Sequence, residues 1–302
     1  MTISTWAGVA AATALVFGMP AAAGAHAGPA TRSASTARTL AIGPVLHPFV
    51  RTARGRGRVA APLESANWSG FIDGVTLSGS SLQSVHATFT SVSASFTVPQ
   101  LSASSPTNSS NAVWTGIGGV LGSGGIVQAG VLESFKNQKN QTYTPIVEDY
   151  PNPIVPLSEP VSPGDTLTVT ITDTSGGWTL TMSDSGTNSW SFGPTDISSY
   201  YGAGAFVTPD TQSAEWIDED PFCGGTYCKF ATFSPANFSA VKDTATSAVS
   251  RTPLETIIVN RFGQPEVSVS PSSIGSTTTA GGAYDSFTVT RGVSSSGHGP
   301  HA

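Results

Sequence analysis

The stretch DTLTVTITD, residues 165–173, has an apolar side chain at every second position within it and threonine between them. Side chains of a β-strand point alternately to its two faces, so this pattern predicts a strand with one buried face. The alternation returns in WTLTM (178–182) and NSWSF (188–192), and DSGT (184–187) between them supplies turn residues. The sequence therefore predicts a run of strands joined by tight turns.

Similar short segments fill most of the chain after residue 63, with Gly, Pro, Asn and Ser between them. Further candidate strands are 67–73, 91–98, 111–117, 125–133, 142–149, 212–219, 229–234, 254–260, 265–270 and 284–291. Only 236–249 offers a modest helical possibility. We therefore expect an all-β domain over residues 63–292, a β-sandwich of two antiparallel sheets of the concanavalin or lectin-like jelly-roll type. A flexible Ser- and Gly-rich tail, 293–302, would follow it.

Charge is distributed unevenly along the 302 residues. Residues 1–63 contain six arginines and no acidic residue, whereas residues 64–302 contain seven basic and nineteen acidic residues. The two parts therefore carry formal charges of +6 and −12. An acidic domain lacks the basic face that nucleic-acid binding requires, and a basic leader before it is typical of a secreted protein with a removable pro-segment.

The first 62 residues have the features of export and processing. Residues 6–19 form an apolar run followed by small residues, which predicts a signal peptide over residues 1–27. Residues 28–62 predict a disordered basic pro-segment, and we hypothesise that its cationic side chains lie against the acidic domain and hold it inactive. No later stretch is apolar for long enough to span a bilayer, so we expect a secreted, extracellular monomer that contacts no membrane after signal removal.

Few residues are available for nucleophilic or metal chemistry. Between the leader and the tail the histidines are His47, in the pro-segment, and His86, for which a surface or strand-edge position fits better than a Ser-His-Asp triad. Cys223 and Cys228 are the only cysteines; in an exported protein they predict a small disulfide loop, and a cysteine nucleophile is the weaker alternative. We expect no metal and no cofactor, so carboxylates remain for acid–base chemistry.

Asp184, in DSGT, matches the active-site signature of pepsin-like aspartic peptidases. Those enzymes use two such loops, and DTSG at 173–176 is not a convincing second copy because Gly follows it. A hairpin turn between two Trp-bearing strands explains Asp184 better.

Two other segments place polar side chains where a buried strand face would be apolar. In QSAEWIDEDPFC (212–223) a strand would direct Glu215 and Glu219 to one face, and in GGIVQAGV (124–131) it would direct Gln128 to a face shared with apolar and Gly neighbours. In a cleft, repulsion and partial burial raise the pKa of paired carboxyl groups, which suits pH-tuned catalysis. A solvent-facing strand with scattered polar residues is the alternative on these features alone.

Seven segments in order resemble the glutamic peptidases, the eqolisin family (G1) of secreted acid endopeptidases. They cover most of residues 64–260 and are NWSGF (67–71), ASFTVP (94–99), AVWTGIGG (112–119), IVQAGV (126–131), YTPIVEDYP (143–151), AEWIDED (214–220) and FATFSPANF (230–238). The resemblance implies a sandwich of two antiparallel sheets, a precursor form and a peptide substrate.

The resemblance also implies roles for single residues. The catalytic glutamine and glutamate of the family fall on Gln128 and Glu219. Trp68, Trp114 and Glu148 fall on substrate-binding positions of its cleft, and its disulfide falls on the two cysteines.

Two departures from the family pattern fall in this cleft. Gly118 replaces an aspartate of WVGIDG, and Tyr143-Thr144-Pro145-Ile146-Val147-Glu148-Asp149 replaces YDAWYEW. They bear on substrate preference more than on reaction type.

The implied mechanism is hydrolysis without a metal or a covalent intermediate. Glu219 would take a proton from water and Gln128 would donate to the developing oxyanion. Two alternatives stay open at this stage. One is a sandwich that binds carbohydrate or peptide without cleaving it, and the other is a glycoside hydrolase that uses Glu148 and Glu219.

Overall fold

The computed structural model describes residues 40–41, 62–79, 81–121, 125–223, 226–246, 249–259, 266–271 and 281–291. They all belong to one compact unit, residues 38–302. The expected signal peptide (1–27), the expected tail (293–302) and all of the expected pro-segment except residues 40, 41 and 62 lie outside the described residues. The described part contains no helical segment of the length and hydropathy that a bilayer requires.

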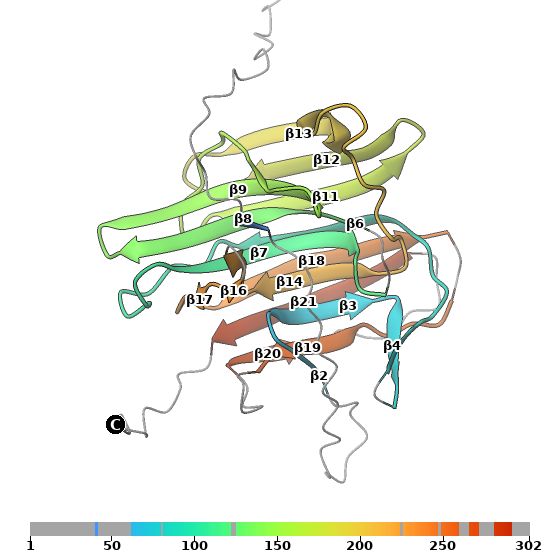
Figure 1. The fold of residues 1–302 in the computed structure, drawn as a ribbon, viewed down its shortest axis with the longest axis horizontal. Helices are drawn as coiled ribbons and strands as arrows, with labels where there is room; N and C mark the ends of the chain where they lie inside the picture. Colours follow the sequence, from blue (N-terminus) through green and yellow to red (C-terminus); the bar gives the residue numbers. More distant parts are fainter. Residues whose placement is uncertain are drawn as a thin grey trace, which may run out of the picture. The chain divides into compact units, whose positions relative to one another are not determined.

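Two stacked β-sheets form the domain (Figure 1). The first sheet has nine strands, in the order β10-β9-β8-β7-β14-β3-β19-β2 with β17 paired to β7. Their bounds are β10 Val155–Pro156, β9 Asn140–Tyr150, β8 Ile126–Asn137, β7 Ser109–Gly118, β14 Ala214–Glu219, β3 Trp68–Asp73, β19 Leu254–Ile258, β2 Leu63–Ser65 and β17 Lys229–Phe230.

The second sheet has seven strands, in the order β13-β12-β11-β6-β18-β21-β20. Their bounds are β13 Trp190–Asp196, β12 Gly177–Asp184, β11 Thr166–Thr174, β6 Phe89–Thr97, β18 Ala236–Ala245, β21 Gly281–Arg291 and β20 Val267–Pro271. The all-β sandwich is confirmed, and the alternating stretch at 165–173 is β11, a central strand of this sheet. Neighbouring strands are antiparallel except for two short pairs, β17 with β7 and β19 with β2.

Three small elements complete the described domain. The hairpin β4–β5, Val75–Ser78 and Ser81–Ser84, is one that the sequence did not predict. A 3₁₀ turn spans Ile197–Tyr200. A three-stranded sheet joins β1, Leu40–Ala41, to β15, Phe222–Cys223, and β16, Thr226–Tyr227.

The main core lies between the two sheets. Alternate residues of β11, Leu167, Val169 and Ile171, are fully buried in it, as the two-residue period requires. They pack with residues of the facing sheet such as Val127 and Trp216.

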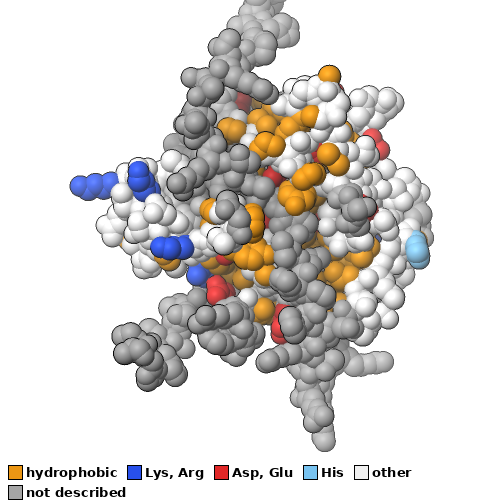
Figure 2. Space-filling model, in the orientation of Figure 1, with side chains coloured by type: hydrophobic (Ala, Val, Ile, Leu, Met, Phe, Trp, Pro, Cys, Tyr) orange, Lys and Arg blue, Asp and Glu red, His pale blue; other side chains and the backbone are white. Residues whose placement is uncertain are grey.

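A second apolar cluster covers the outer face of the nine-stranded sheet. It contains Leu63, Trp68, Ile72, Val75, Ala112, Trp114, Ile126, Ile146, Ile217 and Leu254. The central strands β3, β14 and β7 are therefore buried on both faces along their whole length. Figure 2 shows hydrophobic side chains gathered over the middle of the face it displays, with Lys and Arg side chains mainly toward one edge.

The modest helical possibility at 236–249 is wrong for residues 236–245, which form strand β18 between β6 and β21. The register between β18 and β6 shifts between Ser239 and Lys242, and Ala240 has a positive φ of 50°. This bulge changes the spacing of buried residues from two to three between Phe238 and Val241, and such spacing resembles a helical period.

A buried ion cluster ties the two sheets together. The Arg251 guanidinium donates to Asp73 at the end of β3 and to Asp243 of β18, at 2.8 and 2.6 Å. Tyr284 of β21 donates to the same Asp73 carboxylate. Burial, together with the charge of Asp73, raises the pKa of Asp243 to about 6.

We expect Arg251→Ala to lower the free energy of unfolding by about 3–5 kcal/mol at neutral pH, because two buried carboxylates lose their cation. Urea unfolding of the variant measures the loss. Lys242→Ala removes an exposed cation from β18 and serves as the control, with an expected change within about 0.5 kcal/mol. Equal effects of the two substitutions would contradict a role for the cluster in joining the sheets.

Candidate active site

Strand β14 carries the two glutamates that the sequence singled out. Trp216 points into the main core, where its indole nitrogen donates to the Ser93 carbonyl at 3.0 Å. Ile217 belongs to the outer cluster. Because side chains alternate, Glu215 and Glu219 share the outer face with Ile217, as the sequence predicted.

Glu219 is fully buried and held by two donors. Trp114 Nε1 of β7 donates to Oε2 at 2.8 Å, and Asn67 Nδ2 donates to Oε1 at 2.9 Å. Asn67 stands directly before β3, where its backbone nitrogen donates to Ser65 Oγ. Sequence analysis missed Asn67, although it precedes Trp68 within the segment NWSGF.

Gln128 and Glu148 form a cross-strand pair on β8 and β9. Gln128 Nε2 donates to Glu148 Oε2 at 2.5 Å, and both side chains are buried. The structure therefore brings Gln128 together with Glu148, and Glu219 together with Trp114.

The two pairs interact electrostatically. Burial raises the pKa of Glu219 well above its usual value, and the charge of Glu148 raises it further. The hydrogen bonds from Trp114 and Asn67 oppose these effects because they stabilise the carboxylate. Glu219 thus combines a raised proton affinity with donors that accommodate its charged form.

Trp68 and Trp114 pack edge to face, with ring centroids 5.0 Å apart and an interplanar angle of 76°. Both are fully buried in the outer cluster. They therefore lie on the face that carries Gln128 and Glu219 and not between the sheets.

The backbone explains the departure at Gly118. Its φ is +97°, and a Cβ there would lie 2.3 Å from the Asp210 carbonyl oxygen and 2.7 Å from that of Gly125. An aspartate side chain has no room at this position, because the loop before β14 packs against it.

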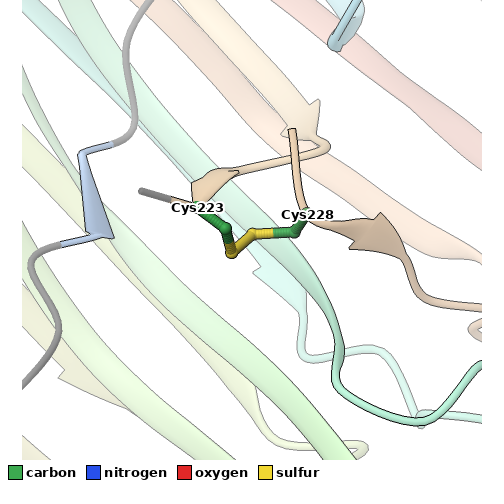
Figure 3. Close-up of a disulfide and its surroundings, with 2 residues drawn as sticks. All are labelled: Cys223 and Cys228. Carbon is green, nitrogen blue, oxygen red and sulfur yellow. A yellow bond between two sulfur atoms is a disulfide. The ribbon is translucent and has the colours of Figure 1, made fainter. Parts of the chain in front are cut away.

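The cysteines form the predicted disulfide (Figure 3). Cys223 and Cys228 are linked with a Cα–Cα distance of 5.0 Å. The bridge closes the β15–β16 hairpin four residues after Glu219, and β1 pairs antiparallel with β15 (Leu40 with Cys223, Ala41 with Phe222).

Two other residues weighed in the sequence lie away from this face. His86 is exposed in the loop after β5, as expected for a surface residue. Asp184 ends β12, and its Oδ1 accepts from the Gly186 nitrogen at 2.7 Å, so it belongs to a hairpin turn. Among the described residues, His, Cys, Asp and Glu form no group of three or more suited to a metal ion.

The reverse face of β14 contains a second pair of acids. Asp218 and Glu133 of β8 are fully buried, and Asn111 Nδ2 donates to Glu133 at 3.1 Å. Burial raises the pKa of both carboxyl groups well above the usual range, and the charge of Asp218 raises that of Glu133 further. Of the neighbouring groups, Asn111 lowers both values, while Arg291 lowers and Asp220 raises that of Asp218.

Comparisons with known proteins agree with this architecture. A model of the peptidase A4 family matches residues 75–280. Two crystal structures of scytalido-glutamic peptidase, one with a transition-state analogue inhibitor and one with a peptide-based analogue, resemble the chain with TM-scores of 0.53 and 0.52. Each is 22% identical and covers 75% of this chain and 98% of the other.

A third structure, aspergilloglutamic peptidase from Aspergillus niger, is 24% identical over 61% of this chain and 99% of its own, with a TM-score of 0.46. No curated protein matches the chain by sequence.

We expect the stability of the fold to fall as pH rises above about 4, the value at which free carboxyl groups titrate. Glu133 and Asp218 keep their protons to higher pH in the folded state than in the unfolded state. The unfolded chain therefore loses these protons first, and each group costs up to about 1.4 kcal/mol of stability per pH unit.

Urea unfolding between roughly pH 3 and pH 7 measures this dependence. Glu133→Gln should reduce the slope of the unfolding free energy against pH by the contribution of one titrating group. Asp173→Asn, which changes an exposed acid of β11, should leave the slope unchanged. A stability that rises over this range in the unmodified protein would refute the interpretation.

Proposed function

Because the chain belongs to the peptidase A4 family of glutamic peptidases, the eqolisins, we propose that Gln128 and Glu219 are the dyad with which this glutamic-type endopeptidase hydrolyses peptide bonds. One observation carries the proposal: Glu219 is held by Trp114 and Asn67 on the face where Gln128 is held by Glu148. Both side chains are thereby oriented before substrate binds.

Glu219 acts first as a general base. Its carboxylate takes a proton from a water molecule, and the water oxygen attacks the carbonyl carbon of the scissile peptide bond. The hydrogen bonds from Trp114 and Asn67 favour the carboxylate form that this step requires, against the burial and the Glu148 charge that raise the pKa of Glu219. The same proton then passes from Glu219 to the leaving nitrogen, so the C–N bond breaks with no net change in the enzyme.

Gln128 stabilises the charge that develops on the carbonyl oxygen. Its amide nitrogen carries two hydrogens, and the bond to Glu148 fixes the direction of one and therefore of the other. A donor that is already oriented loses no energy to reorganisation during the reaction. In this scheme Glu148 is a positioning residue.

The contact between Gln128 and Glu148 also bears on the rival functions. In a glycoside hydrolase that used Glu148 and Glu219 as its two carboxylates, Gln128 would have no catalytic role. Here Gln128 donates a hydrogen bond directly to Glu148, which supports a role for it in the reaction. The match to a peptidase family favours an enzyme that cleaves peptides over a sandwich that only binds them.

We further propose that the enzyme is secreted and works in acid. Its domain has nineteen acidic and only seven basic residues, so it passes through electrical neutrality as its carboxyl groups take up protons and keeps only a small positive charge below that pH. Charge repulsion in acid is therefore limited. The buried acids Glu133 and Asp218 are also protonated under those conditions.

The proposed precursor has four parts: a signal peptide (1–27), a pro-segment (28–62), the peptidase domain (63–292) and a tail (293–302). Supporting this division, Leu40 and Ala41 pair with β15 close to Glu219. Gln128 and Glu219 are also almost fully buried, and a peptidase needs them accessible to substrate. We propose that the pro-segment keeps the cleft closed until it is removed.

Replacement of the dyad should abolish proteolysis without unfolding the chain. We expect Gln128→Ala to lower kcat/KM by about 100- to 1,000-fold and Glu219→Gln by at least as much, measured by casein or peptide digestion at roughly pH 2–5. Asp184→Asn is the control, because it converts a carboxyl group into an amide as Glu219→Gln does, but in a hairpin turn away from the dyad. This variant should stay active. Full activity of either dyad variant would eliminate the assignment, and pepstatin should not inhibit the enzyme.

Removal of residues 28–62 tests the pro-segment. We expect the full-length chain to digest peptide only after a delay and the shortened protein to digest it without one, or the shortened protein to refold in lower yield. Removal of the tail, 293–302, is the control and should change neither quantity. If the full-length and shortened chains match in activity and in refolding yield, the pro-segment has no inhibitory or folding role.

A further inference from the structure

A group of buried polar atoms lies beside the proposed dyad and takes no part in its mechanism. Both carboxyl oxygens of Glu215, the hydroxyl of Ser213 and one oxygen of Asp210 have no hydrogen-bond partner among the described residues. Glu215 and Ser213 are fully buried.

The three side chains lie close to one another. Burial raises the pKa of Glu215, Ser213 lowers it, and the charge of Asp210 raises it further. Asp210 is held in place through its backbone, which donates to the Gly125 carbonyl at 3.0 Å. Its other carboxyl oxygen accepts from the Gln212 nitrogen, so the loop that carries it is locally ordered.

Glu215 lies in the same row of the sheet as Gln128. Glu215 of β14 pairs with Gly116 of β7, Gly116 pairs with Gln128 of β8, and Gln128 pairs with Glu148. Two strand spacings separate Glu215 from Gln128, which is about 10 Å between backbones.

The position between them has no side chain. A Cβ on Gly116 would lie 3.0 Å from the Cβ of Gln128 and 3.1 Å from the Trp114 ring. Gly116 is therefore required by close packing, because Gln128, the Val127 carbonyl oxygen and the Trp114 ring already occupy the space beside it. This packing keeps β14, β7 and β8 in register, with Glu215 and Gln128 in one row.

These atoms require a partner that donates hydrogen bonds. A buried polar group without one loses its hydration at a cost of about 1–3 kcal/mol, and more when it is charged. Acceptor oxygens and two carboxyl groups suit a cation. Yet none of the hydrogen bonds or ion pairs of the described Lys and Arg residues involves Glu215, Ser213 or Asp210.

We propose that Glu215, with Ser213 and Asp210, forms a subsite that binds a basic side chain, lysine or arginine, of the peptide substrate near the scissile bond. The proposal rests on the proposed function, because it takes the scissile bond to lie at Gln128 and Glu219. Glu215 and Glu219 are both fully buried on the same face of β14, so a substrate reaches either one only after that face is uncovered.

A lysine ammonium group carries three donors and an arginine guanidinium five, enough to engage these oxygens together. An acidic substrate side chain would instead bring a third carboxyl group to the same place and no cation. Glu215 is then a specificity-determining residue and not a catalytic one.

The test compares peptides that differ at one residue. Two series place lysine or its uncharged analogue norleucine on either side of the bond that the enzyme cleaves. We expect the unmodified enzyme, in its mature form, to prefer lysine in one series. Glu215→Gln should reduce the lysine-to-norleucine ratio of kcat/KM by about 10-fold or more, because a buried charged hydrogen bond is lost.

Ser213→Ala provides a second, milder variant and should reduce the same ratio by a few-fold. Asp173→Asn, which removes an exposed acid from the other sheet, is the control and should leave the ratio unchanged. Circular dichroism establishes that each variant is folded; if Glu215→Gln does not fold, Ser213→Ala decides. An unchanged ratio in the folded variants, or no preference for lysine in the unmodified enzyme, would overturn the proposal.

Binding separates this proposal from the proposed function. Two variants are compared by isothermal titration calorimetry: Glu219→Gln alone and Glu219→Gln together with Glu215→Gln. Each is titrated with the lysine peptide and with the norleucine peptide. A lysine preference in binding that depends on Glu215 would support the subsite. If the unmodified mature protein then cleaves no peptide, the peptidase mechanism alone is refuted. Cleavage without such a preference would refute the subsite alone.

Discussion

The two-residue period of β14 is the constraint on which the rest of the site depends. Trp216 must enter the core between the sheets, where its indole nitrogen reaches the Ser93 carbonyl. Once Trp216 is fixed, Glu215 and Glu219 can only lie on the outer face. A slip of one residue would bury both glutamates between the sheets and move the tryptophan to the outer face. The packing that stabilises the sandwich is therefore also what orients the chemistry.

The outer face differs from an ordinary solvent-facing sheet surface because it is itself apolar. Trp68, Trp114 and Ile217 form part of an apolar cluster on that face, and Glu219 is fully buried there. A carboxylate in such surroundings must be supplied with donors, and Trp114 and Asn67 supply them. The acids on the reverse face, Asp218 and Glu133, have fewer donors and are most easily accommodated with their protons attached. The two faces of the sheet therefore act differently on their acids: donors favour the charged form of Glu219, and burial favours the protonated forms of Asp218 and Glu133.

Most of the architecture could be predicted from alternation alone, as β11, β12 and β13 show, because each has one clearly apolar face. The prediction was wrong at 236–245, where a bulge at Ala240 interrupts the period. The hairpin β4–β5 was missed because its residues are largely exposed and carry no strong pattern. At the site, the order of short motifs identified Gln128 and Glu219. Asn67 could not be identified in this way, because its role depends on a contact with a residue 152 positions away.

The position of Gly118 has a consequence for redesign of this cleft. The carbonyl oxygens of Asp210 and Gly125 occupy the space that any L-amino-acid side chain at 118 would need. A change of polarity at this end of β7 therefore cannot be made on the strand itself. It has to come from the side chains of the loop that precedes β14, whose backbone is bonded to the sheet through Asp210 to Gly125 and Gly118 to Ser213. Substitutions that alter the polarity of this end of the cleft are thus restricted to the loop before β14, and the central strands stay unchanged.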